Sequence, residues 1–156
     1  MPTDHAPSRL ADRVHHFPVR VYYEDTDAGG VVYHANYFQF AERARTEMLR
    51  ERGLAQSRLS AELGIFFVLR QCVADFLAPA RLDDYLLVIS RLVDLRGASF
   101  DLEQKVTRDG LELVRLRVKL ACRSANGQVV RLPAPVHSIL AELSGNIWAD
   151  DGKQRG

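Results

Sequence analysis

The sequence predicts an α+β fold in which a curved antiparallel β-sheet wraps around one long central α-helix. Two observations carry this prediction. Apolar residues recur at helical spacing over residues 37–52, and from Ile65 onward the pattern changes to an alternation of period two. The alternating segments have one apolar face that must be covered, and this helix is the only long predicted element free to cover it. At 156 residues the chain is long enough for one domain with a sizeable core.

The first predicted element is a strand at residues 17–23, where Phe17, Val19, Val21 and Tyr23 fall on one side. The central helix follows and stops at Gly53. Residues 55–64 form either a shorter second helix or a lid-like connection.

Four further strands, each of roughly ten residues, complete the predicted sheet. They lie at residues 66–76, 85–96, 99–110 and 111–124. Asp109-Gly110 is a strong two-residue hairpin signal, and Asn126-Gly127 is a second. Long strands joined by tight turns form an antiparallel meander. We expect one domain at residues 16–145, with mobile tails at 1–15 and 146–156.

Composition argues against several classes of protein. The chain has 21 basic and 20 acidic residues, and this balance gives no electrostatic case for binding nucleic acid. It contains no run of about 18 apolar residues, so we expect no signal peptide, no membrane span and a cytoplasmic location. Cys72 and Cys122 lack the spacing of a zinc site, and we expect both to be reduced core thiols.

The stretch "EDTDAGGVVYHANY", residues 24–37, carries the chemistry-bearing side chains. It is not a calcium loop, because Gly29 and Asn36 stand where two ligands are required. The chain contains neither phosphate-binding glycine motif and no GxSxG elbow, and its histidines form no HExxH pair. We therefore expect no metal and no cofactor, and what remains is carboxylate chemistry where a strand meets a helix.

This junction has the two parts that acyl transfer needs. Gly29 and Gly30 permit a close backbone approach to a ligand, and the first turn of the helix offers free amide N–H groups to a developing oxyanion. Asp27, ionised at neutral pH, is available as a nucleophile or as a base for water.

Structural roles for the same residues remain open at this stage. Asp27 could instead cap a turn, and Asp25 could be a structural charge. His34 could cap or pack against the helix. Tyr33 and Tyr37 could be core or interface aromatics. The residues alone establish a carboxylate facing a helix N-terminus.

The run "VRVYYEDTDAGGVVYHANYFQFAERARTEML", residues 19–49, closely resembles the hotdog-fold acyl-CoA thioesterases of the 4-hydroxybenzoyl-CoA thioesterase family. It is most similar to the Tol-Pal-associated (YbgC-type) subgroup, and weaker similarity extends over residues 17–143. The resemblance implies that Asp27 is the catalytic carboxylate. It also implies an oxyanion-binding amide at or next to His34, with the His34 imidazole polarising or positioning the carbonyl. Tyr33 would shape the acyl pocket.

The resemblance further implies a substrate and an assembly. Basic side chains before "SF" and beyond the last hairpin, here Arg96 and Arg131, would meet the phosphates of coenzyme A. The substrate would be an acyl-CoA, with an acyl carrier protein as the alternative carrier. The chain would form a homo-oligomer, a dimer or tetramer with sites between subunits. The rival function is a non-catalytic acyl-carrier-binding partner of a membrane-associated lipid or envelope complex, and a hydratase acting on enoyl thioesters is a weaker third.

Overall fold

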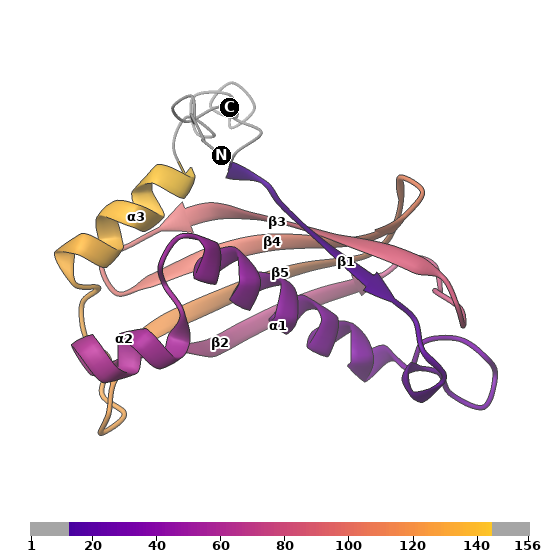
Figure 1. Cartoon of the computed structure of the whole chain (residues 1–156), viewed down its shortest axis with the longest axis horizontal. Helices are drawn as coiled ribbons and strands as arrows, with labels where there is room; N and C mark the ends of the chain where they lie inside the picture. The colour runs from indigo at the N-terminus through magenta and orange to yellow at the C-terminus, as the bar shows by residue number, and fades with distance from the viewer. Residues whose placement is uncertain (1–12, 145–156) are drawn as a thin grey trace, which may run out of the picture.

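The computed structural model describes residues 13–144, which form a five-stranded antiparallel sheet with three α-helices (Figure 1). The elements in chain order are β1 (His15–Arg20), the short 3-10 helix η2 (Tyr23–Asp25), α1 (His34–Glu51), α2 (Gln56–Leu63), β2 (Ile65–Phe76), β3 (Tyr85–Leu95), β4 (Ser99–Arg108), β5 (Leu111–Ser124) and α3 (Ala134–Ser144). The predicted α+β class and hotdog architecture are confirmed. The predicted tails lie outside the described residues, apart from residues 13–15.

The strands are arranged in the order β1-β3-β4-β5-β2, so that β1 and β2 form the two edges. The hairpin predicted at Asp109-Gly110 joins β4 to β5, with Arg108 paired to Leu111. Asn126-Gly127 also makes a turn, but its return pairs only through the isolated bridge between Arg123 and Val129. The meander therefore ends at β5, and the chain leaves the sheet.

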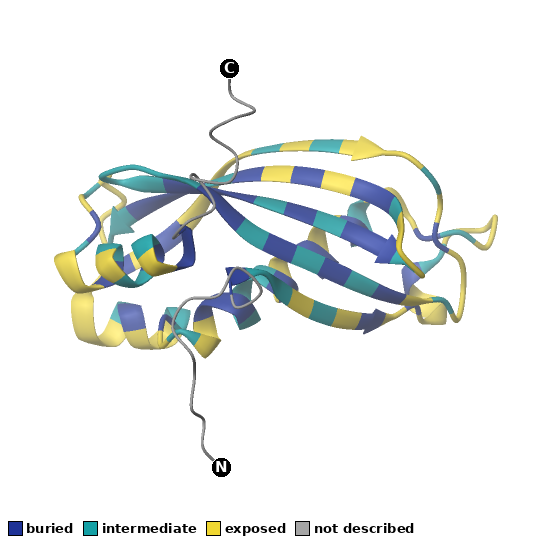
Figure 2. Ribbon diagram, turned by 90° about the horizontal axis from the view of Figure 1, so that it is seen from above, coloured by how far each residue is buried: buried dark blue, intermediate teal, exposed yellow. Residues whose placement is uncertain are grey.

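Helix α1 lies across one face of the sheet and supplies the centre of the core (Figure 1). It begins at His34, three residues earlier than the predicted 37, and its buried stripe is Tyr37, Phe40, Ala41, Ala44, Met48 and Leu49. Figure 2 shows buried and more exposed residues alternating along the strands, as a sheet covered on one face requires. Buried Gln104 of β4 joins the two layers, because its amide donates to the Ala41 carbonyl at 2.9 Å.

The predicted strand at residues 17–23 ends too late. Strand β1 stops at Arg20, and although Val19 and Val21 are buried as predicted, Tyr23 is 83% exposed. The physical reason is a capping interaction: the Tyr22 amide donates to the Asp25 carboxylate at 2.8 Å and turns the chain into η2. Alternation of apolar residues gives no sign of this turn, because the tyrosines continue the pattern.

Two helices lie at the opposite end of the sheet from the start of α1 (Figure 1). The ambiguous segment 55–64 is a helix, α2, which Gly64 ends in the left-handed conformation. Helix α3 was not predicted, although Val136, Leu140 and Leu143 have helical spacing and are all buried. It packs against β3, so α1 is not the only helix that covers the sheet.

The two cysteines are free thiols, as expected: Cys122 is buried, while Cys72 is partly buried. Burial raises the pKa of both thiols, so they stay protonated at neutral pH. None of the helices between residues 13 and 144 combines the length and apolar character that crossing a membrane requires.

Candidate active site

Asp27 lies at the tip of a small hairpin that leads from η2 into α1. Thr26 and Val32 form its bridge, and the Asp27 amide donates to the Val31 carbonyl at 2.9 Å. The Gly30 amide closes the turn on the Asp27 carbonyl at 3.0 Å, with Gly30 at a φ of 80° that favours glycine. Residues 27–30, with the sequence DAGG, therefore form the turn. The role of Gly30 in the structure is to adopt the positive φ that this turn requires.

The carboxylate of Asp27 is exposed and only partly engaged. Its Oδ1 accepts the Gly29 amide at 2.8 Å and, weakly, the Val31 amide at 3.4 Å. Within residues 13–144, no donor meets Oδ2. The turn-capping role left open by the sequence is thus real, and it uses one oxygen while leaving the other facing solvent.

Asp25, two residues earlier, is in a different environment. It is 7% exposed, and its carboxylate accepts the Tyr22 amide at 2.8 Å and the Asn36 side chain at 3.0 Å. Its carbonyl also accepts the Tyr33 amide at 3.0 Å. Asp25 therefore fixes the loop to the first turn of α1, and it is not available for chemistry.

Helix α1 presents an open N-terminus beside this loop. Its N-cap residue, Tyr33, makes no side-chain cap, and the first turn contains no acidic residue. In the described chain, no acceptor meets the amides of His34 and Ala35, which lie at the positive end of the helix dipole. The His34 side chain is exposed and lies against the Tyr33 ring, with centroids 4.5 Å apart. The N-terminus is thus set up to receive negative charge.

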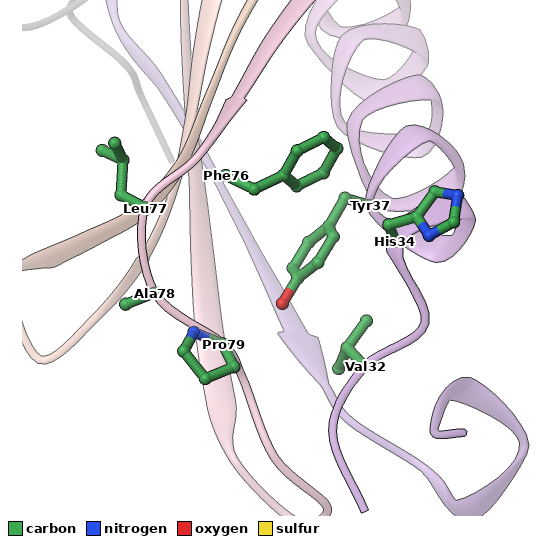
Figure 3. Close-up of a pocket in the computed structure, with 7 residues that line it drawn as sticks. All are labelled: Val32, His34, Tyr37, Phe76, Leu77, Ala78 and Pro79. Carbon is green, nitrogen blue, oxygen red and sulfur yellow. The ribbon is translucent and has the colours of Figure 1, made fainter. Parts of the chain in front are cut away.

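An apolar pocket of about 290 Å³ opens next to this N-terminus. It is lined by Val32, His34, Tyr37, Phe76, Leu77, Ala78 and Pro79. Figure 3 shows the Tyr37 and Phe76 rings pointing into the space between α1 and the segment after β2, with His34 at the rim. The Tyr37 hydroxyl accepts the Ala80 amide at 3.0 Å, and burial raises the pKa of this phenol.

Tyr33, predicted to shape the acyl pocket, is half exposed and does not line this pocket in the single chain. Tyr37 and Phe76 line it instead. Tyr37 could be recognised in the sequence only as a core or interface aromatic. Phe76 follows the inward alternation of β2, and nothing in the sequence places it opposite Tyr37, because the two residues meet only through tertiary packing.

The predicted phosphate-binding arginines lie together at the far end of the sheet, near the turn between β3 and β4. Arg96 is paired with Asp94 and Asp101, and its Nε donates to the Ser99 hydroxyl at 2.8 Å. The Arg131 guanidinium lies against Gly97 of the same turn. Strand β4 has ten residues and is about 30 Å long, and this turn lies at the end of the sheet away from the start of α1 (Figure 1).

In the described part of the chain, no three His, Cys, Asp or Glu side chains gather closely enough to hold a metal ion. The α1 end offers a partly free carboxylate, open helix amides and an apolar pocket. This combination can bind an apolar acyl group and stabilise an oxyanion formed at its carbonyl.

The chain is similar to known thioesterases in sequence and in fold. A family model described as the thioesterase-like superfamily matches residues 21–142. Acyl-CoA thioesterase YbgC of Haemophilus influenzae is 47% identical over 113 residues, which are 72% of this chain and 83% of the relative. A probable thioesterase structure from Bartonella henselae is 39% identical with a TM-score of 0.74, covering 77% of this chain and 99% of that one. The 4-hydroxybenzoyl CoA thioesterase from Pseudomonas sp. strain CBS-3 shares the fold at 21% identity, with a TM-score of 0.76, covering 81% of this chain and 99% of that one.

Proposed function

Because the chain belongs to the thioesterase-like superfamily, as its sequence predicted, we propose that it hydrolyses an acyl-CoA thioester to a free carboxylate and coenzyme A. The observations that carry this proposal are the exposed Asp27 carboxylate, on the hairpin that leads into α1, and the open N-terminus of that helix with an apolar pocket next to it. The acyl-CoA thioesterase relative supports the reaction class. The roles of individual residues are our assignments.

In the proposed reaction the acyl group enters the pocket and the thioester carbonyl oxygen meets the amides of His34 and Ala35. One such donor contributes about 10²- to 10³-fold to the rate, because it stabilises charge that develops only in the transition state. The His34 imidazole at the rim assists by positioning the carbonyl, and Gly30 keeps the hairpin backbone close to the substrate.

Asp27 then supplies the second half of the chemistry. As a base it takes a proton from water, whose oxygen bonds to the carbonyl carbon. As a nucleophile it forms an anhydride that water later opens. In either route the carbon–sulfur bond breaks, the electron pair leaves with sulfur, and the thiolate takes up a proton. Because Oδ1 is held by the Gly29 amide, Oδ2 is the oxygen we assign to this step.

We also propose that the working form is a homo-oligomer, a dimer or a tetramer. Edge strand β2 leaves Leu69, Val73 and Phe76 about half exposed. An apolar, unpaired edge of this kind favours pairing with another chain. If two copies pair antiparallel along β2, the Asp27 end of one sheet lies beside the arginine end of the other. Arg131 of the partner subunit would then complete the site, which one chain alone spreads over about 30 Å.

The test of the reaction is thiol release from a panel of acyl-CoA and acyl carrier protein thioesters. Short aliphatic, long aliphatic and aromatic acyl groups are all included, because most of the residues that line the pocket are apolar. We expect turnover of at least one substrate. Failure of the whole panel, together with retention of an envelope or Tol-Pal component by the purified protein, would replace hydrolysis with a binding role.

Oligomerisation is tested separately by light scattering coupled to size-exclusion chromatography. The wild-type chain should elute as a dimer or tetramer. Val73→Lys introduces a charge on the exposed edge and should release monomer with little activity. Lys119→Glu, on the neighbouring strand β5, provides a charge-changing control away from the edge. A fully active wild-type monomer would eliminate the shared site.

A further inference from the structure

The wall of the apolar pocket contains a buried hydroxyl group that the proposed reaction does not use. Among the seven residues that line the pocket, only Tyr37 carries a hydroxyl, and this side chain belongs to a residue that is 3% exposed. Its oxygen accepts the Ala80 amide at 3.0 Å. In the part of the chain that the structure describes, no acceptor receives the hydroxyl proton. Tyr37 therefore has an unused hydrogen-bond donor in the pocket wall.

This donor lies on the side of the pocket away from the rim. Figure 3 shows the Tyr37 hydroxyl pointing away from His34, with its oxygen between Val32 and Pro79. A thioester carbonyl held at the start of α1 is near His34, so the acyl group that follows it extends toward this hydroxyl.

The position of the hydroxyl is fixed by the fold. The Ala80 amide holds the oxygen, and Ala80 is itself fully buried. The Tyr37 ring packs edge-on against Phe40, with centroids 6.2 Å apart, and lies 5.9 Å from the ring of Phe76. A donor held in this way cannot move aside for a group that does not pair with it.

The surroundings of the hydroxyl favour an uncharged acceptor. Burial outweighs the hydrogen bond from Ala80 and raises the pKa of Tyr37, so the phenol keeps its proton at neutral pH. The charged side chains that act on it, Arg108 and Asp84, are paired with each other at 2.7 Å. Arg108 also donates to the Pro79 carbonyl at 3.3 Å. A buried carboxylate would therefore find no uncommitted cation among these groups.

Filling the pocket changes the balance of hydrogen bonds at Tyr37. Water can accept the hydroxyl proton while the pocket is empty, and a bound acyl group displaces that water. An alkyl chain leaves the donor unpaired, which is unfavourable, whereas an oxygen at the right position replaces the water. The volume of about 290 Å³ is at the lower end of the range for ligand pockets, and it suits a short acyl group.

We infer that Tyr37 is a specificity-determining residue whose hydroxyl donates to an uncharged oxygen of the bound acyl group. The preferred substrates are short acyl groups that carry a keto, hydroxyl or ether oxygen, in preference to alkyl groups of the same length. The inference rests on the proposed function for the presence of an acyl group in the pocket. It rests on the unused, fixed donor of Tyr37 for the oxygen on that group.

The experiment measures kcat/KM for hexanoyl-CoA and for its 3-oxo, 4-oxo and 5-oxo derivatives, which differ only in a ketone that accepts but does not donate. With the wild-type protein, at least one ketone should exceed hexanoyl-CoA by about tenfold, the size of one hydrogen bond between neutral groups. Tyr37→Phe should abolish this preference. Hexanedioyl-CoA, which ends in a carboxylate, should be the poorest substrate, and a preference for it would contradict the assignment of an uncharged oxygen.

The ratio between substrates separates specificity from structural damage. Tyr37→Phe also removes the acceptor of the Ala80 amide, and this loss affects all the substrates alike. Tyr85→Phe is the matched control, because it removes the hydroxyl of a residue that is 56% exposed and does not line the pocket. It should leave every ratio unchanged. If Tyr37→Phe does not fold, the wild-type protein decides, since equal kcat/KM for hexanoyl-CoA and all three ketones overturns the inference.

Binding separates this inference from the proposed reaction. The four thioesters are titrated into the purified Asp27→Asn oligomer, in which we expect no turnover. Binding of one ketone about tenfold tighter than hexanoyl-CoA, lost when Tyr37→Phe is added, supports the inference even if the wild-type protein hydrolyses none of them. Hydrolysis without any ketone preference overturns the inference and leaves the reaction standing. No binding of any of the four thioesters overturns the inference as well.

Discussion

Each end of the sheet has two residues of the same type, two aspartates at one end and two arginines at the other. At each end, one residue makes hydrogen bonds or ion pairs that hold the fold together, and the charge of the other is not fully paired. At the α1 end, buried Asp25 fixes the loop while exposed Asp27 keeps one free oxygen. At the opposite end, Arg96 is neutralised by carboxylates while Arg131 lies uncommitted on Gly97. The comparison teaches that residue type does not assign a role in this protein. The role follows from which hydrogen bonds and ion pairs the fold has already used.

Among the variants, Asp27→Asn should have the largest effect on activity. It tests directly whether Asp27, and not Asp25, carries the chemistry. We expect kcat/KM to fall by about 10²- to 10⁴-fold, because the amide cannot act as a base or a nucleophile. Stability should hardly change, because the Asn oxygen can still accept the Gly29 amide. Thiol release and a thermal melt of the same preparation measure both. Near-normal turnover would remove Asp27 from the chemistry.

Asp25→Ala should mainly lower stability. We expect a loss of about 2–3 kcal/mol, because the Tyr22 amide and the Asn36 side chain lose their shared acceptor, the buried Asp25 carboxylate. Urea unfolding measures it, with Glu24→Ala, an exposed neighbour, as the control. If Asp25→Ala folded normally but lost all activity, the roles of the two aspartates would be reversed.

Arg96→Gln applies the same comparison to the arginine pair. Its cost should be about 1–2 kcal/mol, because Asp101 keeps Arg117 but loses its second partner. Arg131→Gln should change stability by less than about 0.5 kcal/mol, as expected for an exposed side chain without such a partner. Equal losses in the two variants, measured by urea unfolding, would show that the arginines do not differ in structural role.

Asp84 lies in the loop that precedes β3, near the start of α1. Its substitution should have the smallest effect on the free energy of unfolding. Partial burial acts to raise the pKa of this carboxyl, but hydrogen bonds from the Arg81 amide and the Arg108 side chain hold it below its ordinary value of 3.8. A depressed pKa stabilises the fold above pH 3.8, and the contribution is lost as the pH falls through the folded-state value.

Asp84→Asn should therefore cost about 1 kcal/mol at neutral pH. The difference in unfolding free energy between this variant and the wild type should stay constant between pH 5 and pH 8. It should shrink in more acidic solution, and urea unfolding at acidic and neutral pH measures both. A difference that persists unchanged in strong acid would mean that Asp84 acts through packing and not through its charge.

Much of the fold was predictable because periodicity reports burial directly. The strands and the buried stripe of α1 follow from the spacing of apolar residues, and Asp109-Gly110 makes its predicted turn. Helix α3 was not predicted although its apolar spacing is present; Pro133 precedes it and Pro135 lies in its first turn, where proline is tolerated. Tyr23 was misplaced because a side-chain cap, not periodicity, ends β1.

The sequence by itself determined the architecture, the turn at Asp27 to Gly30 and, through resemblance, the family. These depend on local spacing and backbone preference, which neighbouring residues carry. Only the tertiary structure decided that Asp25 is buried and Asp27 is exposed, that Tyr37 meets Phe76, and that Arg131 lies on Gly97. Burial and pairing depend on which distant surfaces come together, and no local pattern of residues records that.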